Sequence, residues 1–345
     1  MAFDHIQNSY GIIQHGPQGQ LVPVEMAYDV DEVLRTTGLD WKVQLVPAYI
    51  HHAWGMQEQV KNHFFVVRED TRGLLSKHTV SDRYRVIQNE TAFNLLRDLL
   101  AKRLVRIEMV GENPYNDSIW MLARSEHAYQ VRGVDPMMQY FLFSHGHDGA
   151  TAFSAFVVPI RVYCTNMFMM IKRLYKNGEF RVSHTKVSAE RMLSIEKNIH
   201  IANEEFNRHG QHADALAAVQ LTEDGLKTFL EGMFPCAEED DDKDLNIRKR
   251  NDVRQILETT SLNAMPILLR NSLWHLFQAV TYYVNHVAPV RVGRDEAEMA
   301  SMLRFDARAA RRFGSLTTGA GRSLSTQAFE SVLEMAGIPH PAKKR

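Results

Sequence analysis

The sequence predicts an α+β fold, with an antiparallel sheet braced by helices in the N-terminal half and a helical C-terminal half. Between residues 64 and 163, short runs rich in β-branched and aromatic residues follow one another. One helical pattern interrupts them, but no strand–helix alternation is sustained, which argues against a parallel sheet. After residue 185 the apolar residues recur at helical spacing. We therefore expect a sheet-rich α+β domain over residues 1–186 and a helical domain over residues 187–345.

The N-terminal half is expected to contain two helices between its strands. The first runs from Asp31 to Thr37 and ends at Gly38, a residue that favours helix termination. The second runs from Glu90 to Lys102, where apolar residues recur at helical spacing and Asn89 precedes them as a possible N-cap. Strands are expected in the β-rich runs at residues 64–67, 78–87, 103–110, 118–124, 140–145 and 155–163.

The C-terminal half reads as a series of amphipathic helices. The acidic run at residues 236–244 separates them, and we expect it to be an exposed connection because like charges do not bury together. The last helix is expected to end at Gly337, with Pro339 beyond it. Helices are expected over residues 188–207, 222–234, 271–286 and 326–336.

The composition excludes several classes of protein. Of the 345 residues, 45% are hydrophobic and 23% charged, which is typical of a globular chain and not of a disordered or collagen-like one. The formal charge of −1 means that any nucleic-acid site must be a local patch. Two cysteines, Cys164 and Cys236, fit a reducing compartment. With no signal-peptide pattern and no run apolar enough to span a bilayer, we expect a cytoplasmic protein without a membrane partner.

Four residues from separate parts of the chain have the chemistry of metal ligands. They are His147, Asp148, Cys164 and His184, and imidazole, carboxylate and thiolate are the groups that bind zinc or iron. None of them has the close spacing of a known metal motif. The alternative is that His147, Asp148 and Gly149 form a hairpin turn and that Cys164 packs in the core.

A basic stretch with interleaved aromatic residues predicts a nucleic-acid site. Residues 161–191 hold seven Lys or Arg against two Glu. Cations neutralise phosphates and aromatic rings stack on unpaired bases. The alternative is a solvated helix face with its rings turned inward. The residues chosen for this site are Arg161, Tyr163, Lys172, Arg173, Lys176 and Arg181.

A second basic segment lies at Arg83, Tyr84 and Arg85. On a strand, alternation places both arginines on one face and Tyr84 on the other. The arginines then either follow a nucleic-acid backbone or form surface ion pairs of about 0–1 kcal/mol each. We expect them to share one groove with the cations of residues 160–181. The glycine-rich, arginine-rich stretch at residues 311–323 is interpreted as an interhelical loop, with an anion-binding nest as the alternative.

Several sequence strings, taken in order, resemble a known family. They are TTGLDWKVQ (36–44), SDRYRVIQNETAF (81–93), SHGHDG (144–149), PIRVYCTNMF (159–168) with SHT (183–185), and LWHLFQAVTYYVNH (273–286) followed by RRFGS (311–315). Together they resemble the phage/plasmid-like proteins grouped as a domain of unknown function. The resemblance implies cargo of phages, prophages and plasmids, and no settled activity. A looser similarity is to single-strand annealing proteins, in which a short antiparallel sheet braced by a helix assembles into rings on DNA.

Three functions follow as hypotheses. The first is a non-enzymatic, homo-oligomeric protein of a phage or plasmid that binds or anneals single-stranded DNA in recombination or replication, without a cofactor, in the host cytoplasm. The second is a metal-dependent nuclease or hydrolase that uses His147, Asp148, Cys164 and His184. The third is an inhibitor of a host defence system.

Overall fold

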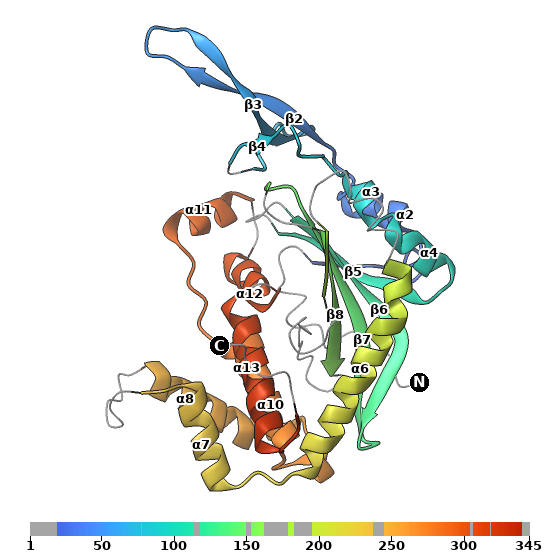
Figure 1. Ribbon diagram of the computed structural model, residues 1–345, viewed down its shortest axis with the longest axis vertical. Helices are drawn as coiled ribbons and strands as arrows, with labels where there is room; N and C mark the ends of the chain where they lie inside the picture. The colour runs from blue at the N-terminus through green and yellow to red at the C-terminus, as the bar shows by residue number, and fades with distance from the viewer. Residues whose placement is uncertain are drawn as a thin grey trace.

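The chain folds around a central antiparallel sheet, with helices packed on the sheet and a long hairpin projecting from one end (Figure 1). This is the α+β class that the sequence predicts. The predicted boundary near residue 186 lies outside the described residues, as do residues 237–244 of the acidic run. The computed structural model describes residues 19–76, 78–113, 118–149, 153–161, 179–182, 195–236, 245–303, 306–317 and 319–339.

The central sheet has six antiparallel strands in the order β1-β5-β6-β7-β8-β9. In its middle, Leu122, Leu142 and Phe156 pair across three strands, and all three side chains are buried. Every residue of β8 is buried, so both faces of this strand are covered. The strands are β1 (Gln20–Leu21), β5 (Val105–Asn113), β6 (Ser118–Val131), β7 (Asp135–Gly146), β8 (Phe153–Arg161) and β9 (Glu179–Val182).

Different helices cover the two faces of the sheet. Trp120 and Phe156 lie on one face, where Phe313 stacks on Trp120 with ring centroids 5.1 Å apart and Arg322 lies 4.9 Å over Phe156. Gln139 lies on the other face and donates to the carbonyl of Ala202. The first pair of contacts comes from the helices α12 (Ala307–Thr317) and α13 (Ala320–Met335), and the last from α6 (Ile195–Ala218).

The helix α6 is held against β6 by contacts at helical spacing. His127 Nε2 lies 2.8 Å from Asn207 Oδ1, and the Tyr129 hydroxyl donates to Asp214 at 2.7 Å. Between these two contacts, the Tyr129 ring lies directly on Gly210: a Cβ there would be 2.4 Å from the ring. Only glycine lets the helix approach the strand so closely.

The short helices of the N-terminal half lie together beside β5 (Figure 1). The first, α2 (Val30–Thr37), is capped by Asp29 and ends at Gly38 with φ +70°, as predicted. The predicted helix over residues 90–102 is two helices, α3 (Asn89–Phe93) and α4 (Leu95–Ala101), separated at Asn94. Asn89 does not cap this helix, because its side chain donates to the carbonyls of Leu39 and Trp41.

A second, three-stranded sheet contains the projecting hairpin, which we call the arm (residues 43–68). Its strands are β2 (Val43–His51) and β3 (Gln57–Arg68), and the short β4 (Val80–Ser81) pairs with β3 at the base. At about 3.3 Å per residue, a strand the length of β2 spans about 30 Å. Figure 1 shows the arm extending away from the rest of the protein. The predicted strand at residues 64–67 lies in the arm, whereas the one predicted at 78–87 is only two residues long.

The remaining helices form the C-terminal half and share a hydrophobic core with the sheet. The predicted helix at residues 271–286 is α10, which continues as the π-helical turn η3. The prediction of a loop at residues 311–323 is wrong, because α12 extends to Thr317 and α13 begins at Ala320. These helices are α7 (Glu223–Met233), α8 (Leu245–Glu258), α9 (Thr260–Asn263), η2 (Ile267–Leu269), α10 (Leu273–Tyr282), η3 (Tyr283–Val287) and α11 (Arg294–Leu303).

In the described part of the chain, no helix has both the length and the apolar character that crossing a membrane requires.

The contact at Gly210 gives a stability prediction. Gly210→Ala should lower the free energy of unfolding by about 1–3 kcal/mol, because the added methyl group forces the Tyr129 ring or α6 to move. Gly232→Ala on α7 is the matched control: a Cβ there meets nothing within 4 Å, so it should stabilise by about 0.4–1 kcal/mol. Urea unfolding measures both, and equal effects at the two positions would contradict the packing described here.

Candidate nucleic-acid interface

The arm presents apolar and aromatic side chains to solvent. Trp54 is 71% exposed, Met56 62%, and Tyr49 and Ile50 50% each. The other three tryptophans are buried. Exposed aromatic residues on a projecting hairpin have no part in the core, and a cluster of this kind marks an interaction surface.

A tight turn at the tip of the arm fixes the position of Trp54. His52 N–H donates to the Met56 carbonyl at 2.9 Å, and Gly55, with φ +86°, donates back to His52 at 3.0 Å. The His52 ring stacks on Trp54 with centroids 4.7 Å apart and 14° between planes. Glu58 holds the other end of this imidazole at 3.2 Å. The indole is thus supported by His52, while most of its surface remains open to a ligand.

A large bulge separates the tip of the arm from its base. Pro47 pairs with Phe64 and Tyr49 with Gln59, so Ala48 alone faces residues 60–63. Asn62 within this bulge has φ +61°, a conformation that asparagine tolerates better than most residues. Because bulges bend a strand and increase its twist, this one sets the direction in which the tip points.

The chain after β4 brings Arg83, Tyr84 and Arg85 to the base of the arm. The two arginines are exposed, but they lie in a turn and an irregular segment and not on the predicted strand. Tyr84 is only 9% exposed, and burial together with Asp148 raises the pKa of its hydroxyl well above the usual value. The expectation that Tyr84 stacks on bases is therefore wrong, because its ring faces the core. The arginines remain candidates for phosphate contacts.

The arm and its base carry an excess of positive charge on a nearly neutral chain. Residues 42–85 contain seven Lys or Arg and four Asp or Glu. Some of this charge is neutralised locally: Arg68 pairs with Asp70 and Glu112. Lys61, Arg72 and Arg83 are exposed, and the ion pairs found in the described residues include none of them.

The predicted phosphate ligand Arg161 lies instead in the interior. Its side chain is 2% exposed, and Nε donates to both carboxylate oxygens of Asp135 at 2.7 and 2.6 Å. Nη2 donates to the Ala264 carbonyl at 2.7 Å, and Trp274 Nε1 donates to Asp135 at 3.0 Å. A guanidinium used in this way does not reach a nucleic-acid backbone. The expectation that Arg161 shares a groove with Arg83 and Arg85 is therefore wrong.

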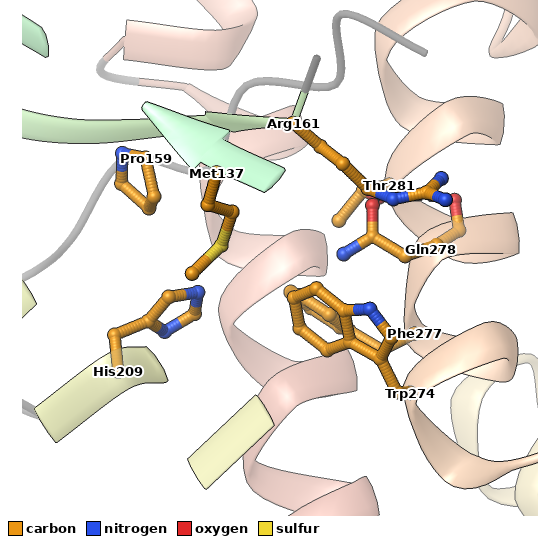
Figure 2. Close-up of a pocket in the computed structure, with 8 residues that line it drawn as sticks. All are labelled: Met137, Pro159, Arg161, His209, Trp274, Phe277, Gln278 and Thr281. Atoms are coloured by element: carbon orange, nitrogen blue, oxygen red, sulfur yellow. Dashed lines mark hydrogen bonds between the residues drawn. The ribbon is translucent and has the colours of Figure 1, made fainter. Parts of the chain in front are cut away.

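A small cavity lies beside this ion pair, where β7 and β8 meet α6 and α10 (Figure 2). Its volume is about 10 Å³, the space of one water molecule. A cavity of this size does not hold an organic substrate. Its lining residues are Met137, Pro159, Arg161, His209, Trp274, Phe277, Gln278 and Thr281.

Two buried histidines, His209 and His275, lie near the Asp135–Arg161 ion pair. Burial lowers the pKa of His209 to about 3. Burial, and then the charge of Arg161, lower the pKa of His275 to about 4. His275 also lies in the first turn of α10, where the helix dipole opposes a positive charge. The two imidazoles near the Asp135–Arg161 ion pair are therefore neutral at pH 7.

The structure assigns His147 a role in packing. It is buried, its Nε2 lies 2.7 Å from Asn89 Oδ1, and its ring meets Trp41 edge to face. Asp148 is half-buried. Within the described residues, no three His, Cys, Asp or Glu side chains lie close enough together to hold a metal ion.

Of the remaining predicted site residues, Arg181 lies in the described part of the chain and six others lie outside it. Arg181 belongs to β9, where it pairs with Ser154 in the backbone register. The residues that lie outside the described part of the chain are Tyr163, Lys172, Arg173, Lys176, Cys164 and His184.

Sequence reasoning missed Tyr49 and Trp54, the two exposed aromatic residues of the arm. The string His-His-Ala-Trp-Gly-Met at residues 51–56 contains the turn glycine between two β-rich runs, which is a hairpin pattern. That pattern predicts the turn. It does not predict that the hairpin projects into solvent, which depends on what the rest of the chain covers.

These features define an α+β protein built on an antiparallel sheet, with a projecting hairpin that carries exposed aromatic residues. The chain belongs to the family described as Domain of unknown function (DUF932), which matches residues 77–305. This confirms the domain-of-unknown-function family, whereas the phage or plasmid association and the similarity to annealing proteins stay predictions. The match begins just before β4, so the arm precedes it. No curated protein and no solved structure matches the chain.

The buried ion pair gives a second stability prediction. Asp135→Asn should destabilise the protein by about 3–5 kcal/mol, because it leaves Arg161 charged and buried without a counter-ion. Glu298→Gln breaks the exposed pair with Arg294 and should cost less than about 1 kcal/mol. Chemical denaturation compares the two. A similar cost for both would mean that Asp135 has no special role.

The pKa of His275 predicts how stability depends on pH. The folded protein binds a proton at His275 only near pH 4, whereas the unfolded chain binds one near 6.5. Stability from this group is therefore complete above pH 6.5 and is lost as the pH falls towards 4. His275→Gln should reduce the slope of unfolding free energy between pH 6.5 and 5 by up to about 1.4 kcal/mol per pH unit. The slopes should coincide above pH 7.5, and an unchanged slope below 6.5 would contradict the assignment.

Proposed function

We propose that this protein binds single-stranded nucleic acid, as a non-enzymatic DNA-binding protein of a phage or plasmid acting in recombination or replication. The observation that carries the proposal is the exposure of Trp54 and Tyr49 on a projecting arm with exposed arginines at its base. Aromatic side chains beside a cationic path are what sequence-tolerant single-strand binding uses.

The aromatic tip favours single strands over a duplex. Bases in a duplex are stacked on one another, whereas unpaired bases offer free faces to Trp54 and Tyr49. Stacking contributes about 1–3 kcal/mol per base. Lys61 along the arm, with Arg83 and Arg85 at the base, then neutralises phosphates of the same strand.

Annealing by a homo-oligomer is the form of this activity that we propose. The antiparallel sheet crossed by α6 is the arrangement that the looser similarity to annealing proteins implies. One arm is a small surface, and several arms in an oligomer raise the overall affinity for a long strand without new contacts.

The exposed tryptophan makes the proposal directly testable. Because Trp54 is the one exposed tryptophan of four, binding of oligothymidylate should quench its fluorescence. Trp54→Ala should weaken binding of fluorescein-labelled (dT)20 about 10-fold, since one stacking contact is lost. Arg83→Gln with Arg85→Gln should reduce the slope of log K against log[salt] by about 1.4. Fluorescence anisotropy measures both effects.

The control is Leu268→Ala, which removes a 76% exposed apolar side chain from η2, a part of the chain remote from the arm in sequence. It should bind (dT)20 like the wild type. The proposal fails if the protein does not bind single strands at low salt, or if Trp54→Ala binds as tightly as the control.

A further inference from the structure

One face of α12 carries a cluster of arginines. Arg308, Arg311 and Arg312 follow one another at helical positions i, i+3 and i+4, so they lie on the same side of the helix. Arg308 and Arg311 are exposed and Arg312 is half-buried. The opposite side is buried and apolar, with Phe313 stacked on Trp120 of the sheet. We call the arginine side the α12 basic face.

The sequence of α12 and of the first part of α13 contains no acidic residue. From Ala307 to Phe329 there are four arginines and no Asp or Glu. Asp306, just before the helix, is used as a cap: its carboxylate accepts from the backbone N–H groups of Arg308 and Ala309. This stretch of sequence therefore carries an excess of positive charge in a protein with a net charge of −1.

Two groups lie where α12 meets η3, and one of them responds to the charge of the other. Burial lowers the pKa of the Arg312 guanidinium, whose Nη1 donates to the Val284 carbonyl at 3.4 Å; no carboxylate contributes to the shift. His286, in η3, has a pKa lowered to about 4, first by burial and then by the positive charge of Arg312. The charge of Arg312 therefore creates a positive potential at His286, where α12 meets η3. A bound anion would reduce it.

We propose that the α12 basic face binds the phosphate backbone of a nucleic-acid strand, as a contact surface separate from the arm. Guanidinium groups are planar forks that bind phosphate oxygens in pairs. With a rise of 1.5 Å per residue, Arg308 lies about 4.5 Å from Arg311 and about 6 Å from Arg312 along the helix axis. This spacing suits successive phosphates of one strand.

A membrane surface fits the same charges less well. Helices that lie on membranes bury an apolar face between the lipids. On α12 that face is already packed: Ala309, Ala310, Phe313 and Leu316 are all buried. The exposed side offers arginine without an apolar anchor, which favours a soluble polyanion over a bilayer.

This surface shares its ligand class with the proposed function but none of its residues. Figure 1 shows the arm at one end of the molecule and α12 in the body, beside α13. A protein with both surfaces holds two stretches of strand at once, which is what bringing two strands together requires.

The test is the double variant Arg308→Gln/Arg311→Gln, because both side chains are exposed and their loss leaves the core intact. For fluorescein-labelled (dT)60, the slope of log K against log[salt] should fall by about 1.4, at about 0.7 per lost phosphate contact. Affinity at low salt should fall several-fold. Arg308→Lys/Arg311→Lys keeps the charge and should restore most of the slope. Quenching of Trp54 by the short (dT)10 should not change.

The matched control is Lys227→Gln/Arg254→Gln, which removes two positive charges from α7 and α8, where both are paired with glutamates. The inference is overturned if the α12 variant binds (dT)60 like this control. It is also overturned if the wild-type α12 face binds phosphatidylserine vesicles or polyglutamate, and the variant loses that binding while keeping its affinity for DNA. Loss of DNA binding in the α12 variant but not in Trp54→Ala would support this inference and refute the arm proposal; the reverse result would do the opposite.

Discussion

The buried ion pair between Asp135 and Arg161 joins the two halves of the protein. Asp135 begins β7 and Arg161 ends β8, and together they reach the Ala264 carbonyl before α10 and the indole of Trp274 within it. Burying two charges is costly unless each is fully hydrogen-bonded. The position of α10 against the sheet is therefore tied to this pair, and the cavity beside it has room only for water.

With the interior committed to packing, the surfaces available for binding lie outside it. The arm projects from the body next to β4 and exposes Trp54 and Tyr49. On α12, Phe313 is buried, whereas Arg308 and Arg311 are exposed. Neither surface is a pocket. Both suit an extended, flexible ligand with repeated charge and flat bases better than a small molecule enclosed in a cavity.

Arginine has opposite uses in this structure, and the local sequence does not separate them. Arg161 and Arg308 both follow apolar residues in short, regular segments. Arg161 is neutralised by a carboxylate 26 positions away and donates a hydrogen bond to a carbonyl 103 positions away. Tyr84 and Trp54 differ in the same manner, one ring buried under the base of the arm and the other exposed at its tip. Arg83 and Arg85 are exposed, but they follow β4 in a turn and an irregular segment, so the strand alternation expected for them does not apply.

The sequence alone determined the α+β class, the end of α2 at Gly38 and the helix at residues 271–286, since these follow from local periodicity and turn chemistry. It also indicated the family, through the resemblance of several strings taken in order. The tertiary structure decided that Arg161 is interior, that His147 packs against Trp41, that residues 311–317 and 320–323 are helical, and that the hairpin after Trp41 projects from the body. The reason is physical. Whether a side chain is buried, paired or free depends on segments distant in the chain, and a pattern read over a few residues carries no information about them.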